Sequence, residues 1–489
     1  MSNLSELLPT GGGQNAVDFV ASGTLSSGQT VALRSDGKVE AVSGTSATGS
    51  IGSLAVASST IGGQYLDAAY DSTNQKLFLA FENDTSTYGT GVVGTVSGTT
   101  ITFGTPVVFL SAQTKYTSVA YDSNADKFVV VYADTSQADY GKSRVATVTG
   151  TSISYGSQQT WTSSGAGTAY NRIVYDNATQ NVIVFTKSSK GYAFVGTVSG
   201  TSVSWGSSQG PFEDGGPQYI YAAYDTTSGK YLITYQDSNN SSYGTAVVGT
   251  LSGTTITFGT PAVFNSGTTY MPSLDYSSTS EKFLIAYRDG GDTNKGNCVL
   301  ATISGTSVSF GSEYQYTSGS IANWNSVAYD PDSNTFLIAW YNTTDVRGYY
   351  LQAEVSGATI TFGSATAYPA DGDYPSGYAG YNTNAVYLGS GRVSVSSSTM
   401  SALTIKAFVK QNAYVDSNYA DFIGITAEAI SDTATGAVNV YGGINEAQTG
   451  LTIGSDYYVQ SDGSLSTTVS SVKVGQAISA TTINMMDLT

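Results

Sequence analysis

An all-β fold made of about seven repeated units is predicted by three features of this 489-residue sequence: a recurring motif of four short apolar runs, two aromatic markers that keep its period, and the chemistry of the runs. One copy of the motif occupies residues 118–122, 127–134, 143–148 and 152–156, with turn residues between the runs. A period near 50 residues with about four strands per unit is typical of the blades of a β-propeller. The sequence therefore predicts a propeller.

Two markers fix the period independently. The first is a tyrosine in the first run, at Tyr70, Tyr121, Tyr175, Tyr224, Tyr276, Tyr329 and Tyr381, with spacings of 49 to 54 residues. The second is an aromatic residue before a glycine in the fourth run, at Phe103, Tyr155, Trp205, Phe258, Phe310 and Phe362, with spacings of 50 to 53 residues. Because both markers keep the same spacing, each unit is predicted to be one blade.

The runs have the chemistry of inner and outer strands. The second run, such as 128–132 (FVVVY), is apolar without alternation, as expected for a strand covered on both faces. The fourth run, such as 100–103 (TITF), alternates, as expected for an outer strand with one solvated face. Threonine at the exposed positions keeps β propensity without presenting an apolar edge.

The ring is expected to close with strands from both ends of the repeat region. The sequence has seven first-run markers but six fourth-run markers. Near the start of the repeat region, residues 39–45 (VEAVSGT) resemble residues 96–99 (VSGT). We therefore predict a seventh blade in which N-terminal strands complete C-terminal ones, which removes the free edges of an open ring. The alternative is six blades with spacer strands.

The two termini share a second internal match. Residues 25–39 (LSSGQTVALRSDGKV) align without gaps with residues 451–465 (LTIGSDYYVQSDGSL). Each copy has Asp-Gly between two apolar runs, which is a strong hairpin signal because glycine accepts a positive φ at no steric cost.

This match predicts a small β-barrel or sandwich domain built by both termini, with the propeller inserted into it. The expected boundaries are 1–41 and 400–489 for the terminal domain and 42–399 for the propeller. Residues 38–42 belong to both the hairpin and the proposed closing blade, and the sequence leaves open how they are shared.

Composition excludes several classes of function. The net charge is −17, from 19 basic and 36 acidic residues, and no basic stripe is present, so neither nucleic acid nor an anionic membrane surface is an expected partner. The chain has no histidine, which excludes Ser-His-Asp and Cys-His catalysis and histidine-ligated metals. Cys298, the single cysteine, falls in an apolar strand and is expected to be a buried, inert thiol. We expect no cofactor and no metal.

We expect no export signal or membrane span at the N-terminus, because no basic residue precedes Arg34 and no apolar run is long enough. The composition is nevertheless that of a surface protein. A virion component released by cell lysis would satisfy both observations.

Several segments resemble modules of tailed-bacteriophage structural proteins. Residues 422–432, 436–440, 450–460 and 474–480 resemble a β module found in such proteins, particularly in marine phages, and residues 28–31 with Asp36-Gly37 look like small capsid-decoration modules. The resemblance covers roughly a quarter of the chain. It implies a virion component, either a capsid decoration or a tail fibre, with no catalytic residues.

Candidate binding residues lie at the end of the blades where the loops vary. In a four-stranded meander the loops after the second and fourth strands share one face, and here those loops differ between blades. Varying loops on a rigid scaffold are the usual place for recognition, and aromatic rings beside amides and carboxylates suit glycans. The aromatic candidates are Trp161, Tyr270, Trp324 and Tyr374.

A second set of candidates stands two residues after the aromatic of each second strand. Its polar members are Asn83, Asp134, Asp237, Asp289 and Asn342, with Lys187 at the same position of one blade. Placed symmetrically, they would ring the same face. The alternative is that Asp and Asn there start turns by accepting hydrogen bonds from nearby backbone N–H groups.

These features together predict a non-enzymatic protein of the virion surface or extracellular space. The terminal domain would attach it to other virion proteins or to sister copies in a homo-oligomer, and the propeller face would bind host surface glycans. The alternatives are a glycan-degrading propeller, which would need two carboxylates flanking the scissile bond, and a bacterial adhesin.

Overall fold

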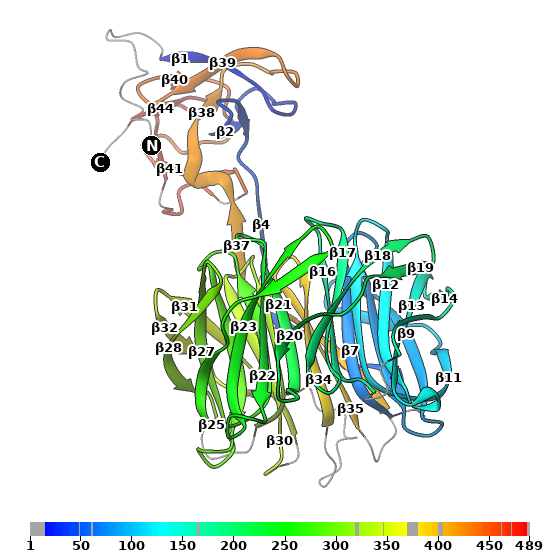
Figure 1. Ribbon diagram of the computed structural model, residues 1–489. Coiled ribbons are helices and arrows are strands. Elements are labelled where there is room, and N and C mark those ends of the chain that lie inside the picture. The colour runs from blue at the N-terminus through cyan, green and yellow to red at the C-terminus, as the bar shows by residue number, and fades with distance from the viewer. Residues whose placement is uncertain are drawn as a thin grey trace. The chain divides into compact units, whose positions relative to one another are not determined.

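The computed structural model in Figure 1 describes residues 15–486 except 48, 60–61, 164–166, 318–321, 346, 369–379, 400–403, 461 and 471. The chain divides into two compact units, one of residues 49–412 and one of residues 1–48 with 413–489. Both are built from antiparallel strands. No helix in the described ranges is long and apolar enough to cross a membrane.

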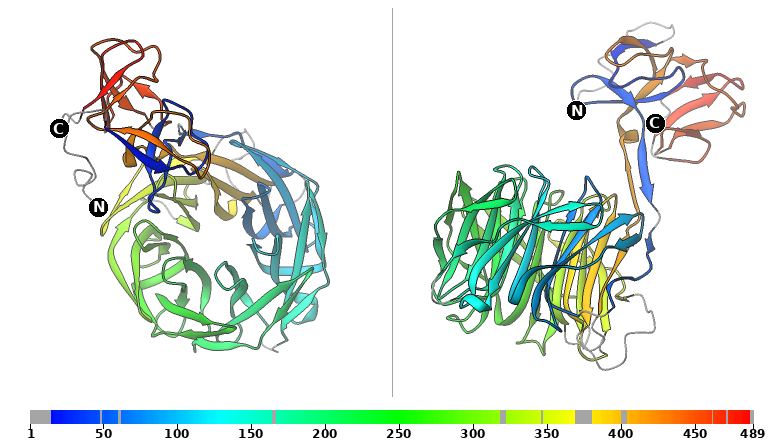
Figure 2. Two further views of the ribbon diagram at one scale, coloured as in Figure 1. Left: turned by 90° about the horizontal axis from the view of Figure 1, so that it is seen from above. Right: turned by 90° about the vertical axis from the view of Figure 1, so that its right-hand side faces the viewer.

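Residues 49–412 form a β-propeller, whose blades radiate around a common axis in Figure 2, left. The described residues contain seven innermost strands: β7 (Gly63–Asp71), β11 (Val107–Asp122), β16 (Ala169–Asp176), β21 (Gln218–Asp225), β25 (Ala262–Ser277), β29 (Ala322–Asp330) and β34 (Gly380–Gly389). The second strands are β8 (Lys76–Asn83), β12 (Lys127–Asp134), β17 (Asn181–Lys187), β22 (Lys230–Asp237), β26 (Lys282–Asp289), β30 (Thr335–Asn342) and β35 (Arg392–Thr399). The third strands are β9 (Tyr88–Ser97), β13 (Tyr140–Thr149), β18 (Gly191–Ser199), β23 (Tyr243–Ser252), β27 (Lys295–Ser304), β31 (Arg347–Ser356) and β36 (Thr404–Gln411).

Short outer strands complete the blades. They are β10 (Thr100–Phe103), β14 (Ser152–Tyr155), β15 (Gln159–Thr162), β19 (Ser202–Trp205), β20 (Gln209–Glu213), β24 (Thr255–Phe258), β28 (Ser307–Gln315), β32 (Thr359–Phe362) and β33 (Thr366–Ala367). The long strands β11 and β25 each begin at the outer edge of one blade and continue as the innermost strand of the next. A 3-10 turn, η2 (Thr135–Gln137), follows β12.

The cores of the propeller lie between neighbouring blades. Second strands such as β8 and β30 are buried along almost their whole length, as their unbroken apolar runs predict. Among the described residues, seven apolar clusters each join two adjacent blades, and one of them packs Leu388 and Ile405 of the last blade against Leu66 of the first. This packing closes the ring.

The closing strands differ from the prediction. The last blade, β34-β35-β36, is completed by β5 (Ser50–Ile51) and β6 (Ala55–Ser58), which pair with β36. N-terminal strands therefore do complete the seventh blade, but residues 39–45 do not. β3 (Val39–Ala41) pairs with β2 (Thr30–Leu33) in the terminal unit, and β4 (Gly44–Ala47) pairs with β37 (Tyr414–Ser417).

Two further expectations need correction at the same blade. β36 belongs to the propeller, so the propeller reaches residue 412 and not 399, and it begins at residue 49 and not 42. Tyr381 is not the first-strand marker of this blade. The register pairs Tyr387 with Val393 as it pairs Tyr329 with Phe336 in the preceding blade, so Tyr387 is the equivalent residue.

The terminal unit contains two five-stranded sheets that share an apolar core. One has the order β1-β39-β38-β2-β3, with β1 (Ala16–Val20), β38 (Phe422–Thr426) and β39 (Thr435–Val440). The other has the order β40-β44-β43-β41-β42, with β40 (Ile444–Asn445), β41 (Asp456–Val459), β42 (Leu465–Ser466), β43 (Lys473–Ala477) and β44 (Ile483–Met485). A 3-10 turn, η3 (Asn418–Asp421), precedes β38. The two Asp-Gly hairpins are confirmed as β2-β3 and β41-β42, and Ala32 and Ile425 of the first sheet pack with Val459 and Val474 of the second.

Candidate functional site

A β-bulge at the start of each innermost strand turns one residue toward the propeller axis. In all seven blades the first strand carries one extra residue at the same place, so two of its residues lie opposite one residue of the second strand. The first bulged residue has a φ of 50° to 53° at six equivalent positions: Tyr65, Tyr116, Tyr170, Tyr219, Met271 and Trp324. A positive φ is unfavourable for such bulky residues, and repeated local strain of this kind is a mark of functional sites.

The bulged tyrosines form a continuous arc of rings, which we call the tyrosine arc. Ring centroids are 4.9 Å apart between Tyr65 and Tyr116, 5.0 Å between Tyr116 and Tyr170, and 5.2 Å between Tyr170 and Tyr219. Tyr270, which precedes the bulge of its own blade, continues the arc at 6.2 Å from Tyr219. Burial raises the pKa of Tyr65 to about 12 and also raises the pKa values of Tyr116, Tyr170 and Tyr219, so these four phenols stay protonated at neutral pH.

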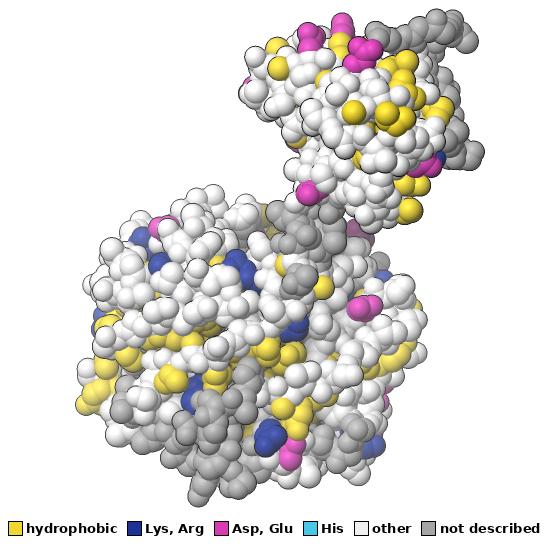
Figure 3. Space-filling view, turned by 180° about the vertical axis from the view of Figure 1, so that it is seen from behind, with side chains coloured by type: hydrophobic (Ala, Val, Ile, Leu, Met, Phe, Trp, Pro, Cys, Tyr) yellow, Lys and Arg dark blue, Asp and Glu magenta, His cyan; other side chains and the backbone are white. Residues whose placement is uncertain are grey.

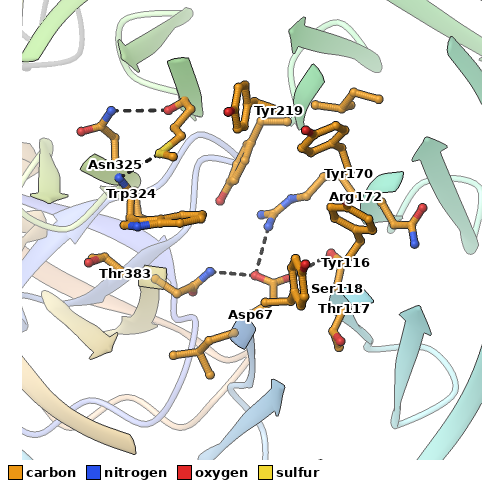
Figure 4. A pocket seen from close by; sticks show the side chains of 18 of the residues that line it. Asp67, Tyr116, Thr117, Ser118, Tyr170, Arg172, Tyr219, Trp324, Asn325 and Thr383 are labelled. Atoms are coloured by element: carbon orange, nitrogen blue, oxygen red, sulfur yellow. Dashed lines mark hydrogen bonds and ion pairs between the residues drawn. The ribbon is translucent and has the colours of Figure 1, made fainter. Parts of the chain in front are cut away.

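The arc, with Trp324 and Met271, surrounds a cavity of about 160 Å³ on the axis, which we call the axial pocket. Figure 4 shows the side chains converging on it from different blades. A cavity of about 150 Å³ accepts benzene, so the axial pocket has room for one ring-sized group. It opens at the end of the blades that carries the varying loops, because the bulges lie beside the C-terminal ends of the second strands.

Asp67 is the hub of the pocket floor. Its Oδ1 accepts hydrogen bonds from Arg172 Nη1 at 3.0 Å and from Asn384 Nδ2 at 2.7 Å. Its Oδ2 accepts from Ser118 Oγ at 2.7 Å and from the Val119 backbone N–H at 2.9 Å. One carboxylate, only 4% exposed, therefore ties together strands of four blades.

Arg172 occupies the centre of the floor (Figure 4). Its Cζ lies 3.8 Å from the centroid of the Tyr221 ring, a cation–π contact. Burial acts to lower the pKa of Arg172, but Asp67, Tyr221 and Asp275 together outweigh it and raise that pKa, so the guanidinium stays charged. Asp275 interacts electrostatically with Arg172, and burial raises the pKa of Asp275 to about 6.

The structure places some of the aromatic candidates at the axial pocket and others away from it. Trp324 lines the axial pocket, and Tyr270 lies in the tyrosine arc with Arg288 Cζ 4.0 Å from its ring centroid. Tyr374 lies outside the described residues. Trp161 is not available for ligand stacking: it is only 4% exposed, and its indole N–H donates to the Lys142 carbonyl at 3.1 Å.

Trp161 was mistaken for a loop residue because the blade has a fifth strand that the motif did not include. In β15 the Trp161 ring packs over Gly141, where a Cβ atom would stand 2.4 Å from the indole. The same aromatic-on-glycine contact recurs as Phe109 on Gly89, Phe212 on Gly191, Phe264 on Gly244, Tyr316 on Gly296 and Tyr368 on Gly348. Trp161 is one member of this repeated core contact.

The polar candidates after the second strands open turns. Asn83 Oδ1 accepts from the backbone N–H groups of Thr85 and Ser86, and Asp237 Oδ1 from those of Asn239 and Asn240. Equivalent bonds start the turns after Asp134, Asp289 and Asn342. All five side chains are at most 9% exposed, which favours the turn interpretation over a ring of ligand-binding groups.

Sequence reasoning missed most of the pocket. The four bulged tyrosines of the arc stand five residues before the first-run markers and so share their period, as in Tyr65 before Tyr70 and Tyr116 before Tyr121. That second aromatic period was the available signal. Arg172 was detectable as the one basic residue at a position held elsewhere by Asp67, Ser118, Tyr221, Ser273, Ser326 and Asn384.

Charge is sparse elsewhere on the propeller. In the view of Figure 3, a few basic and acidic side chains are scattered over a mainly uncharged surface that also exposes hydrophobic side chains. In the described part of the chain, no group of three or more Cys, Asp or Glu residues is placed to hold a metal ion. Cys298 is buried, and burial raises the pKa of its thiol.

No family model matches this chain, and no curated protein sequence matches it. Among solved structures, the chain is similar to a protein of unknown function from Dyadobacter fermentans, with 11% identity and a TM-score of 0.44 over 73% of this chain and 98% of that one. It is also similar to the periplasmic gluconolactonase PpgL of Pseudomonas aeruginosa, with 11% identity and a TM-score of 0.46 over 71% of this chain and 95% of that one. These similarities are too distant to assign a function.

Proposed function

We propose that this protein is a non-enzymatic carbohydrate-binding protein that uses the axial pocket of its propeller for adhesion. The observation that carries the proposal is the combination of an aromatic wall with a polar floor in a cavity of ring size. Sugar rings pack their C–H faces on aromatic rings and use their hydroxyls as hydrogen-bond donors and acceptors. Trp324 and the tyrosine arc supply the first kind of contact, and the floor around Asp67 supplies the second.

The chemistry of the floor supports binding over hydrolysis. A glycosidase of the usual kind needs one carboxylic acid and one carboxylate on either side of the bond. Among the described residues that line the axial pocket, Asp67 is the single carboxyl group, and all of its hydrogen bonds go to neighbouring strands and side chains. These hydrogen bonds support a structural role for Asp67.

We further propose that the terminal unit attaches the protein to a tailed-phage virion, as a capsid decoration or tail fibre, with host surface glycans as the propeller's partners. This part rests on the resemblance of the terminal segments to phage β modules. Antibody labelling of purified particles in electron microscopy tests it: label on the particle surface supports the proposal, and its absence from every particle contradicts it.

A glycan array tests the carbohydrate function. The purified full-length chain should bind a restricted set of glycans, and Trp324→Ala should lose that binding. Tyr88→Ala, at an exposed tyrosine outside the pocket, is the matched control and should bind as the wild type does. Incubation with the bound glycan should release no new reducing ends; their appearance would favour a glycan-degrading enzyme instead.

A further inference from the structure

Arg288 is a partly buried basic residue beside the tyrosine arc. Its Cζ lies 4.0 Å from the centroid of the Tyr270 ring, and it interacts electrostatically with both Tyr270 and Tyr219. The centroids of those two rings are 6.2 Å apart, and Tyr219 lines the axial pocket. Arg288 therefore stands at the rim of the pocket.

The charge of Arg288 is not compensated by a carboxylate of any described residue. Burial lowers the pKa of Arg288, and the groups that act against burial are the phenols of Tyr270 and Tyr219. A guanidinium keeps its charge nonetheless. Arg172 differs, because its Nη1 lies 3.0 Å from Asp67 Oδ1. A partly buried charge without a counter-charge is costly unless a ligand or water compensates it.

The nitrogen atoms of Arg288 are not equally engaged. Nη1 donates to Asn323 Oδ1 of the next blade, whereas Nη2 is not buried and donates no hydrogen bond to a described residue. At the equivalent position of the preceding blade, Gln236 Nε2 makes a comparable link to the Thr269 carbonyl at 2.7 Å. An uncharged amide therefore suffices for a link between blades, which leaves Nη2 and the charge of Arg288 for a ligand.

Charge is distributed unevenly around the arc. Lys187 Nζ lies 5.9 Å from the centroid of the Tyr170 ring, so a basic group stands at each end of the arc segment from Tyr170 to Arg288. At the other end of the arc, the Asp139 carboxylate interacts electrostatically with Tyr65. An anionic ligand group is therefore favoured at the Arg288 end and disfavoured at the Tyr65 end.

We propose that the axial pocket binds an acidic sugar, whose carboxylate or sulfate accepts a hydrogen bond from Arg288 Nη2 while its ring packs against the arc at Tyr219. This inference rests on the proposed carbohydrate function and names its substrate class. Hydrogen bonds between a guanidinium and an anionic oxygen are roughly twice as strong as neutral ones. The pair of Asp67 and Arg172 on the floor is balanced internally, so it neither supplies nor cancels this attraction.

Matched sets of monosaccharides test the charge preference. Glucose, galactose and mannose differ from their uronates and from their 6-sulfates only at C6, so each set isolates the effect of one anionic group. Saturation-transfer NMR and calorimetry on the full-length chain should give at least one acidic sugar that binds about tenfold or more tightly than its neutral form, the effect of one charge-assisted hydrogen bond. The uronates and the 6-sulfates distinguish the two sources of the anionic group.

Variants locate the anionic group. Arg288→Gln keeps an amide for the link between blades but removes the charge, so it should weaken acidic-sugar binding about tenfold and leave neutral-sugar binding unchanged. Lys187→Gln should weaken acidic-sugar binding less. Arg144→Gln is the matched control, because Arg144 donates to the Gly156 carbonyl outside the pocket and its variant should bind both kinds of sugar normally. Unfolding curves identify any variant that has lost its fold.

The outcomes separate the two proposals. Neutral sugars that bind as tightly as every acidic form would overturn the inference and leave the carbohydrate function standing. A preference for acidic sugars that survives in Arg288→Gln, or that Lys187→Gln reduces more, would overturn the role of Arg288. No binding of any sugar would overturn both proposals.

Discussion

Replacing Asp67 by alanine should destabilise the propeller strongly, because this carboxylate links four blades. The change removes the partner of Arg172, whose side chain is 21% exposed, and three further hydrogen bonds. Removing one partner of a buried ion pair costs about 3–5 kcal/mol, mostly because the other charge stays buried without compensation. We therefore expect the free energy of unfolding to fall by about 3–5 kcal/mol.

The control is an aspartate whose ion pair is exposed. Asp214 bonds Lys190 at 2.5 Å, but the two side chains are 73% and 42% exposed. Asp214→Ala should therefore cost about 1 kcal/mol or less. The double variant Asp67→Ala/Arg172→Met should be more stable than Asp67→Ala alone, because it removes the stranded charge.

Urea unfolding followed by tryptophan fluorescence measures these differences cleanly. The chain has four tryptophans, at positions 161, 205, 324 and 340, and all of them lie in the propeller. The signal therefore reports the unfolding of that unit without a contribution from the terminal unit. If Asp67→Ala lost no more stability than Asp214→Ala, the assignment of Asp67 as the hub of the pocket floor would be wrong.

Three other predictions follow from burial and charge. Ala57→Asp should destabilise the propeller by about 3 kcal/mol or more in urea unfolding, because it puts a charge into the core beneath closing strand β6. Val56→Asp, on the exposed side of β6, should stay within about 0.5 kcal/mol of the wild type. Equal effects of the two variants would contradict ring closure by this strand. Burial raises the pKa of Asp275 to about 6 in the folded state, so its stabilising contribution is complete below the pKa of the unfolded state and is lost as the pH rises through about 6. Between about pH 4 and pH 8 the stability of Asp275→Asn should therefore improve relative to the wild type by up to about 3 kcal/mol. A stability difference that does not change with pH would refute this. Trp161→Ala should cost about 3–5 kcal/mol of stability while the folded variant keeps its sugar affinity, whereas Trp324→Ala should lose sugar affinity. Loss of affinity in both folded variants would place the ligand elsewhere.

The repeat was readable in the sequence because each blade buries its second strand on both faces and solvates its outer edge. Runs such as 128–132 and 100–103 carry that difference in their side chains. The closing strands were not readable in the same way. β5 has two residues and β6 has four, too few to show a period. The similarity of residues 39–45 to residues 96–99 led to the wrong closing strand, because β3 pairs with β2 in the terminal sheet.

The site was only partly predictable, because it depends on backbone geometry. The varying loops indicated which end of the blades to examine, and Trp324 and Tyr270 were found there. The bulge that turns Tyr65 and its equivalents toward the axis arises from the register between paired strands, which no single strand records. The role of Arg172 likewise appears only when Asp67, 105 residues earlier, is brought beside it.

A structure of the full-length chain with a bound glycan is the most direct test of the central claim. The account predicts density for one sugar ring on the propeller axis, against Trp324 and the tyrosine arc. A sugar bound only at the outer loops or on the terminal unit, with the axial pocket unchanged, would contradict it.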